Sequence, residues 1–196
     1  MHSSNVVPIK ITPKDNAPIV FSDISDYYWA ADDIYQVTRY GVVEGFPDGT
    51  FRPEKTITRG EILAFLIRSI RDYELTEFPY NQNWFFKEGF SQAAKELGLV
   101  TSRQDNVTYY IKNATREEIA HYMYILLSYK GINTDVDFVS SFTDIASSGY
   151  STDISIVNYY AIIDGYPDNT YKPKQNATRA EAIKLIQRFM SLTGYM

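Results

Sequence analysis

Three arginines stand at matched places in this chain, each inside a Thr-Arg-x-Glu tetrapeptide. The tetrapeptides occupy residues 58–61, 115–118 and 178–181, so successive copies begin 57 and 63 residues apart. An arginine carries a planar fork of N–H donors that grips a carboxylate or phosphate at two points. The same arginine recurring in a repeated unit therefore points to a repeated site for an anion.

The Thr and Glu that flank each arginine have a structural explanation. A Thr followed three residues later by Glu, ahead of an apolar stripe, is a capping box, and it predicts helices beginning just after Thr58, Thr115 and Thr178. The arginine is not explained in this way, because it would sit at the positive end of the helix dipole. Two interpretations stay open. The arginines, with free backbone N–H groups at the helix starts, bind an anionic ligand, or each arginine pairs with an acidic residue of the fold.

The surrounding sequence predicts two helices in each unit. Apolar residues recur at helical spacing after each Thr, and a weaker helical stripe ends at a Gly or Ala that lies 17 residues before it, namely Gly41, Gly98 and Ala161. Pro-Asp-Gly and Pro-Asp-Asn turns at 47–49 and 167–169 separate the helices of the outer copies, whereas the middle copy lacks such a turn. Each unit is therefore predicted to be helix, loop, helix, and the fold to be all-α.

The units are expected at residues 21–73, 78–130 and 142–196, the second with a degenerate loop. Residues 1–20 hold several prolines and are predicted to form an extended linker.

Composition excludes several classes of function. The net charge of -5 argues against a nucleic-acid partner, and the absence of Cys removes disulfides and thiolate metal sites. With two His, we expect no metal and no cofactor. No apolar run approaches the roughly 18 residues of a membrane span, so no membrane partner is expected. The first residues do not resemble a signal peptide, which leaves a cytosolic protein or a piece of a longer exported chain.

Several motifs of the outer copies resemble the S-layer homology domain family. In the first copy these are Phe-Ser-Asp at 21–23, Trp-Ala at 29–30, the loop at 45–53 and Ile-Thr-Arg-Gly-Glu at 57–61. The third copy matches at 142–144, 165–173 and 177–181. The middle copy departs from the pattern, since Tyr80 stands where the acid is expected and the glycine-containing loop is missing.

The resemblance spans about residues 21–192, and the family usually carries three tandem repeats. It implies a pseudo-threefold spindle of helices with ligand grooves between neighbouring repeats. It also implies non-covalent anchoring of an exported protein to the bacterial cell wall, through secondary cell wall polysaccharide that often bears pyruvate ketals. The protein would then lie outside the cell, in the wall or S-layer, and self-association would involve regions outside this chain.

The resemblance also implies a set of ligand residues. The arginines are carried over from the tetrapeptide, and the aromatic residue that follows Phe-x-Asp is carried over as a platform for a sugar ring. The full set is Arg59, Arg116, Arg179, Trp29, Phe86, Tyr150, Asp23, Asp144, Gly41 and Gly98. Because Ala161 replaces the third glycine, its methyl group would obstruct a sugar packed on that backbone. We therefore expect unequal grooves, of which one or two are competent.

Two other functions were weighed against glycan binding. A glycosidase needs two acids about 5–10 Å apart across a cleft, but the repeated glutamates are used as caps, so no enzyme is expected. A protein-interaction or self-assembly module that binds no glycan is the alternative. His121 is expected to lie without a partner on the surface or in a groove.

Overall fold

The computed structural model describes residues 20–70, residue 75 and residues 83–196. The predicted linker therefore lies outside the described residues apart from Val20, as do the boundaries at residues 73 and 78. Throughout the described part the regular elements are helices, joined by loops and three isolated β-bridges, with no strand. The prediction of an all-α fold is confirmed.

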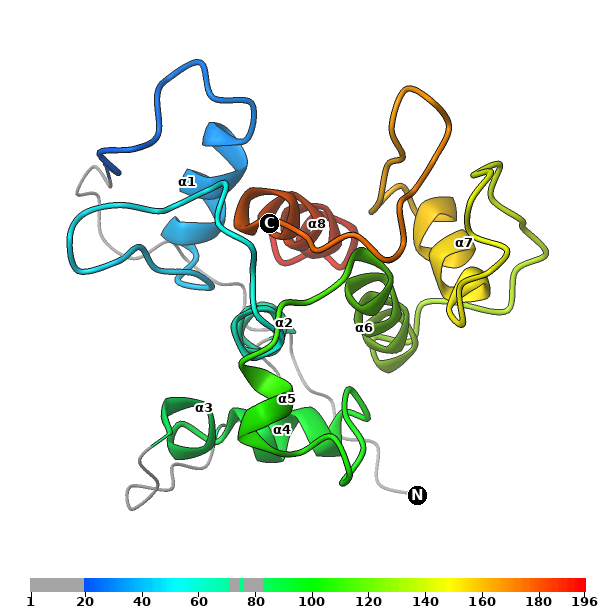
Figure 1. Cartoon of the computed structure of the whole chain (residues 1–196), viewed down its shortest axis with the longest axis horizontal. Coiled ribbons are helices and arrows are strands. Elements are labelled where there is room, and N and C mark those ends of the chain that lie inside the picture. The colour runs from blue at the N-terminus through cyan, green and yellow to red at the C-terminus, as the bar shows by residue number, and fades with distance from the viewer. Residues whose placement is uncertain (1–19, 71–74, 76–82) are drawn as a thin grey trace.

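Three long helices occupy the centre of the molecule, and the shorter ones lie around them in three groups (Figure 1). The central helices are α2 (Arg59–Ile70), α6 (Arg116–Tyr129) and α8 (Arg179–Leu192). The outer helices are α1 (Ala31–Arg39), α3 (Trp84–Lys87), α4 (Phe90–Glu96), α5 (Val107–Tyr110) and α7 (Ser151–Tyr159). The outer helices pack on the central helix of another segment and not on that of their own. The pairs are α1 on α8, α4 on α2 and α7 on α6.

Each central helix begins with the predicted capping box. The Thr58 hydroxyl accepts from the Glu61 backbone N–H at 3.2 Å, and the Glu61 carboxylate accepts from the Thr58 N–H at 2.9 Å. The same reciprocal pair starts α6 and α8. These bonds satisfy backbone donors that a helix start otherwise leaves unpaired.

A ring of backbone hydrogen bonds joins the residues just before these caps. Ile57 N–H donates to the Ala177 carbonyl at 3.0 Å, Ala177 N–H to Ala114 at 3.0 Å, and Ala114 N–H to Ile57 at 2.9 Å. All three side chains are buried. The ring closes on itself, so the three central helices start from one shared point.

The loop before α2 is held by two residues of the Phe-x-Asp motif. The Asp23 carboxylate accepts from the backbone N–H groups of Phe51 and Arg52, both at 2.7 Å. The Phe21 ring lies so close to Gly45 that a Cβ there would be 2.3 Å from its Cε1 atom. Asp144 binds Tyr171 and Lys172 in the same way before α8, at 2.8 and 2.7 Å.

The middle segment departs from the predicted helix, loop, helix pattern. Its first helix is interrupted by Gly89, whose φ of 82° lies in the left-handed region, and is thus divided into α3 and α4. The segment without a Pro-Asp-Gly turn forms the short helix α5, where the Asn106 side chain accepts from the Tyr109 N–H. Side-chain capping by Asn gives this segment helical turns where the outer segments have an open loop.

Candidate functional site

The three arginines of the tetrapeptides form ion pairs within the fold. Each guanidinium binds the capping glutamate of another central helix, in the cycle Arg59–Glu118 at 2.6 Å, Arg116–Glu181 at 3.2 Å and Arg179–Glu61 at 3.3 Å. Of the two interpretations left open by the sequence, pairing with an acidic residue of the fold accounts for all three arginines. The same glutamates also cap their own helices, so each carboxylate serves two contacts.

Neighbouring loops bind backbone donors at all three helix starts. In α6 the N–H groups of Arg116 and Glu117 donate to the carbonyls of Gln175 and Pro173 at 2.9 and 3.0 Å. In α8 the first two N–H groups are bound in the same way by carbonyls of residues 55 and 53, and in α2 the first N–H group donates to the carbonyl of residue 112 at 2.9 Å. The prediction that free N–H groups attract a ligand is therefore wrong for these five donors, because the loops already satisfy them.

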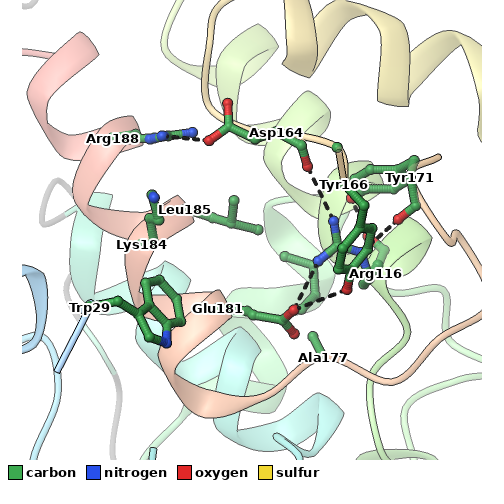
Figure 2. A pocket seen from close by; sticks show the side chains of 12 residues that line it. Trp29, Arg116, Asp164, Tyr166, Tyr171, Ala177, Glu181, Lys184, Leu185 and Arg188 are labelled. Atoms are coloured by element: carbon green, nitrogen blue, oxygen red, sulfur yellow. Dashed lines mark hydrogen bonds and ion pairs between the residues drawn. The ribbon is translucent and has the colours of Figure 1, made fainter. Parts of the chain in front are cut away.

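A hollow of about 230 Å³ opens beside Arg116, and we call it the Arg116 hollow. Figure 2 shows Trp29 and Lys184 along one side of it and Arg116 with Tyr166 along the other. The lining comes from α1's leading loop, α6, α8 and the loop before α8: Trp29, Arg116, Ile119, Asp164, Gly165, Tyr166, Tyr171, Ala177, Glu181, Lys184, Leu185 and Arg188. Trp29 thus comes from the first segment of the chain, whereas the other lining residues come from α6, α8 and the loop before α8.

The guanidinium of Arg116 is held on several sides. Its Nε donates to the Tyr171 carbonyl at 2.7 Å and its Nη2 to the Asp164 carbonyl at 3.2 Å, in addition to the pair with Glu181. The rings of Tyr166 and Tyr171 lie 5.0 and 4.6 Å from it. With these partners the group is fixed in place, and only 11% of its side chain is exposed.

The other charged and aromatic residues of the hollow are more open. Trp29 is 54% exposed, so its indole is accessible to a ligand. Arg188 pairs with Asp164 at 2.6 Å, while the Lys184 ammonium lies 5.4 Å from the centroid of the Trp29 ring. Burial raises the pKa of nearby Asp33, and the positive charges of Lys184 and Arg188 oppose that rise.

A second hollow, of about 200 Å³, lies beside Tyr122, and we call it the Tyr122 hollow. Its lining is rich in hydroxyl groups: Gly98, Leu99, Val100, Thr101, Gln104, Tyr109, Glu118, His121, Tyr122 and Tyr150. Arg59 lies behind it, paired with Glu118 and 4.5 Å from the Tyr109 ring. Burial raises the pKa of Tyr122, so this phenol stays protonated at neutral pH.

His121 has partners, contrary to the prediction that it lies alone. Its ring stacks on Tyr150 at 4.3 Å, and its Nδ1 lies 2.6 Å from an Asp153 carboxylate oxygen. The pairing was not visible in the sequence because Asp153 comes from α7, which packs on α6 from another segment. His121 and Tyr150 do line the hollow, as expected for groove residues.

The third arginine lies in a closed environment. Arg179 makes the same three bonds as Arg116, to the Phe51 carbonyl, Glu61 and the Glu44 carbonyl, yet its side chain is only 3% exposed. Phe65 on α2 occupies the position equivalent to Leu185 on α8. Its ring centroid lies 5.4 Å from the Arg179 guanidinium. Burial lowers the pKa of Arg179, and the charge of Glu61 opposes that shift.

Of the remaining predicted residues, some line a hollow and others contact only side chains or backbone of the fold. Phe86 packs on the rings of Phe85 and Tyr110 within the middle segment. Asp23 and Asp144 bind loop backbone, as described above. Gly41, with a φ of 69°, ends α1, and Gly98, with a φ of 74°, ends α4 and also lines the Tyr122 hollow. Ala161 takes the same left-handed geometry with a φ of 54°. The ligand role of all ten residues stays a prediction.

Sequence reasoning missed Lys184 and Arg188 in the Arg116 hollow. Both follow Glu181 at a spacing of three and then four residues, so they share its face of α8. That spacing was the available signal.

Comparison with known proteins finds a family match in two segments of this chain. Residues 20–63 and 141–183 match the S-layer homology domain. The first segment contains α1 and the start of α2, the second contains α7 and the start of α8, and the middle segment lies between them.

Several larger proteins share this region. The chain is 31% identical to an amylopullulanase of Thermoanaerobacterium thermosulfurigenes over 181 residues, which are 89% of this chain and 10% of the relative. It is 33% identical to exoglucanase XynX of Acetivibrio thermocellus over 177 residues, 86% of this chain and 16% of the relative. A cellulosome-anchoring protein of the same species is 27% identical over 173 residues, 88% of this chain and 26% of the relative. The chain thus spans between a tenth and about a quarter of the length of these relatives.

The enzymes among these relatives therefore share with this chain only a minor portion of their length. In this chain, two segments of that shared portion match the S-layer homology domain. Among the described helices, none combines the length and the apolar character needed to cross a bilayer.

Proposed function

We propose that this chain anchors a bacterial surface protein to the cell wall by binding an anionic, pyruvylated secondary cell wall polysaccharide without covalent bonds. The middle segment is, in this proposal, a third and diverged repeat, and the three repeats form a pseudo-threefold spindle. The protein would lie outside the cell, in the wall or S-layer. Support comes from the S-layer homology matches and from the name of the cellulosome-anchoring relative.

The observation that carries the proposal is the exposed Trp29 beside the cations of the Arg116 hollow. A sugar ring stacks well on an aromatic face, because its C–H groups form an apolar surface of similar size. A carboxylate on the same sugar would lie within reach of Lys184 and Arg188. On a body with a net charge of -5, such a local cationic site favours a discrete anionic group over a long polyanion.

The hollows differ in how well they suit this ligand. The Arg116 hollow combines an exposed indole with lysine and arginine side chains, whereas the Tyr122 hollow offers mainly hydroxyl and amide groups. Arg179 is too buried to contact a ligand unless Phe65 moves. We therefore assign binding to two hollows at most, with the Arg116 hollow as the principal one.

The test is co-sedimentation of the purified chain with wall sacculi before and after extraction of the secondary polymer. We expect binding to intact sacculi and its loss after extraction. Trp29→Ala should weaken binding by about tenfold or more, while Trp84→Ala, which removes an indole of similar exposure outside the Arg116 hollow, should not. Equal binding to intact and extracted sacculi would exclude a polysaccharide ligand and favour a protein-interaction module.

A further inference from the structure

The cations of the Arg116 hollow differ in the partners that they already have within the fold. Arg116 has its Nε and both Nη atoms engaged by Tyr171, Glu181 and Asp164. Arg188 is paired with Asp164 at 2.6 Å and also donates to the Ile162 carbonyl. A ligand carboxylate would have to compete with a fixed carboxylate for either group.

Lys184 differs from these two arginines in its partners. Among the described residues it forms no ion pair within 4.0 Å, and its ammonium lies 5.4 Å from the centroid of the Trp29 ring. A cation over an exposed ring at that distance is held less strongly than a cation in a hydrogen bond between two charged groups. Asp33 feels its charge without reaching it as a salt bridge. Turning the ammonium toward a ligand therefore costs the fold little.

The equivalent position on the other central helices lacks this group. Counting six residues on from the capping Thr gives Ala64 on α2, His121 on α6 and Lys184 on α8. His121 in the Tyr122 hollow is already paired with Asp153, and Glu118 there is paired with Arg59. Of the two hollows, only the one containing Lys184 offers a cation that is not already matched by a carboxylate.

We propose that Lys184 is the residue with which this chain recognises the negative charge of its glycan. Arg116 is then a positioning residue, which holds Glu181 and the Tyr166 loop in place around the ligand. This inference rests on the proposed function and deepens it, because it assigns the charge recognition to one lysine in one hollow. Trp29 and Lys184 would take the two parts of a single acidic sugar, its ring and its carboxylate.

The experiment compares two polymers and three variants. Binding is measured to sacculi with intact polymer and to sacculi whose acid-labile ketal groups have been removed by mild acid. The variants are Lys184→Gln, Lys184→Arg and the control Lys87→Gln, which removes an exposed lysine of α3 outside both hollows.

We expect Lys184→Gln to bind intact polymer about tenfold or more weakly than the unchanged chain. It should also bind the two polymers equally, and its dependence on salt should be reduced. Lys184→Arg keeps the charge and should retain the preference for intact polymer, and Lys87→Gln should behave as the unchanged chain. Melting temperatures of all variants should stay close together, because neither lysine forms an ion pair with any residue that the structure describes.

Two different results would overturn the proposal, and they are distinguishable. If the unchanged chain prefers intact polymer and Lys184→Gln keeps that preference, Lys184 does not recognise the charge although the proposed function stands. If the unchanged chain fails to bind wall polymer at all, the proposed function fails and this inference fails with it.

Discussion

Arg116 and Arg179 make the same bonds in equivalent places, yet one lines a hollow and the other is enclosed. Each guanidinium binds two loop carbonyls and the capping glutamate of another helix. The two sites differ at one position of the neighbouring helix, where Leu185 lines the Arg116 hollow and Phe65 lies 5.4 Å from the Arg179 guanidinium. The shared motif therefore gives both arginines the same partners, while residues outside the motif differ between the open and the enclosed site.

The comparison also shows what the repeated arginine does. Because it is bonded in both places, its first role is to join one segment to the next, whether or not a hollow lies beside it. At Arg179 this role is combined with burial and three hydrogen bonds, so its loss should lower the stability of the fold as well as alter the site.

The largest effect is expected from Arg179→Met. This change removes a buried charge with three hydrogen bonds and leaves the Phe51 and Glu44 carbonyls without it, which should cost about 3–5 kcal/mol of unfolding free energy. Arg116→Met, at a more exposed position, should cost less. Urea denaturation of both variants measures the difference. Equal losses would mean that enclosure adds nothing to the bonds themselves.

The next largest effect is expected from Gly165→Ala. A Cβ there would lie 2.3 Å from the Phe142 ring and 2.8 Å from the Thr170 carbonyl, and the backbone carbonyl cannot simply move aside. We expect a loss of about 2–3 kcal/mol in urea denaturation. Gly45→Ala should lose a similar amount, since its surroundings are matched.

Gly149→Ala is the control for both variants, because a Cβ at Gly149 meets nothing within 4 Å. If Gly165→Ala were as stable as this control, the close ring contact would not constrain the loop.

Replacing Leu185 by the phenylalanine found at the equivalent position of α2 should change polymer binding more than it changes stability. Leu185→Phe is expected to fill the Arg116 hollow and to weaken polymer binding by about tenfold, or about 1.4 kcal/mol. Leu192→Phe, on the same helix at an exposed position, is the matched control. Sedimentation with sacculi measures binding, and unchanged binding of Leu185→Phe would place the ligand elsewhere.

The smallest effect concerns pH and the partner of Arg179. Burial raises the pKa of Glu61, but the Thr58 N–H, Lys55 and Arg179 lower it by more, so the pKa lies below its usual value. A depressed pKa means that the ionised carboxylate stabilises the fold above the unfolded pKa of about 4.3, and that this stability is lost as the pH falls further.

Glu61→Gln should therefore lose about 1 kcal/mol at pH 7 and be much closer to the unchanged chain at pH 3. Urea midpoints at both values measure this, with the exposed Glu96→Gln as control. A constant difference across the range would show that the charge of Glu61 is not what matters.

Much of the frame was predictable from the sequence because it depends on local rules. The capping boxes, the apolar stripes of α2, α6 and α8 and the all-α class follow from residue spacing alone. Trp29 and Tyr150, which the resemblance also indicated, line the two hollows, while their role in binding stays a prediction. The helices of the middle segment were missed, because α5 and the break at Gly89 replace a loop and a continuous helix.

The state of the arginines was not predictable, because it depends on contacts between distant segments. Arg179 meets Glu61 across 118 residues of chain, and Arg116 meets Glu181 across 65. Spacing within a tetrapeptide says nothing about which neighbour a side chain will find. The closure of the Arg179 site by Phe65 was hidden for the same reason, since Phe65 reads as one more apolar residue of a helical stripe.

The crosswise packing of α1 on α8 and the ring of bonds through Ile57, Ala114 and Ala177 have a mechanical consequence. An open array of stacked units has terminal members that can fray or peel away one at a time. Here α8 contacts α2, so none of the three central helices stands at an open end of the array where a pulling force could begin to separate it. A module of this kind should resist load as one body and, past its limit, give way all at once.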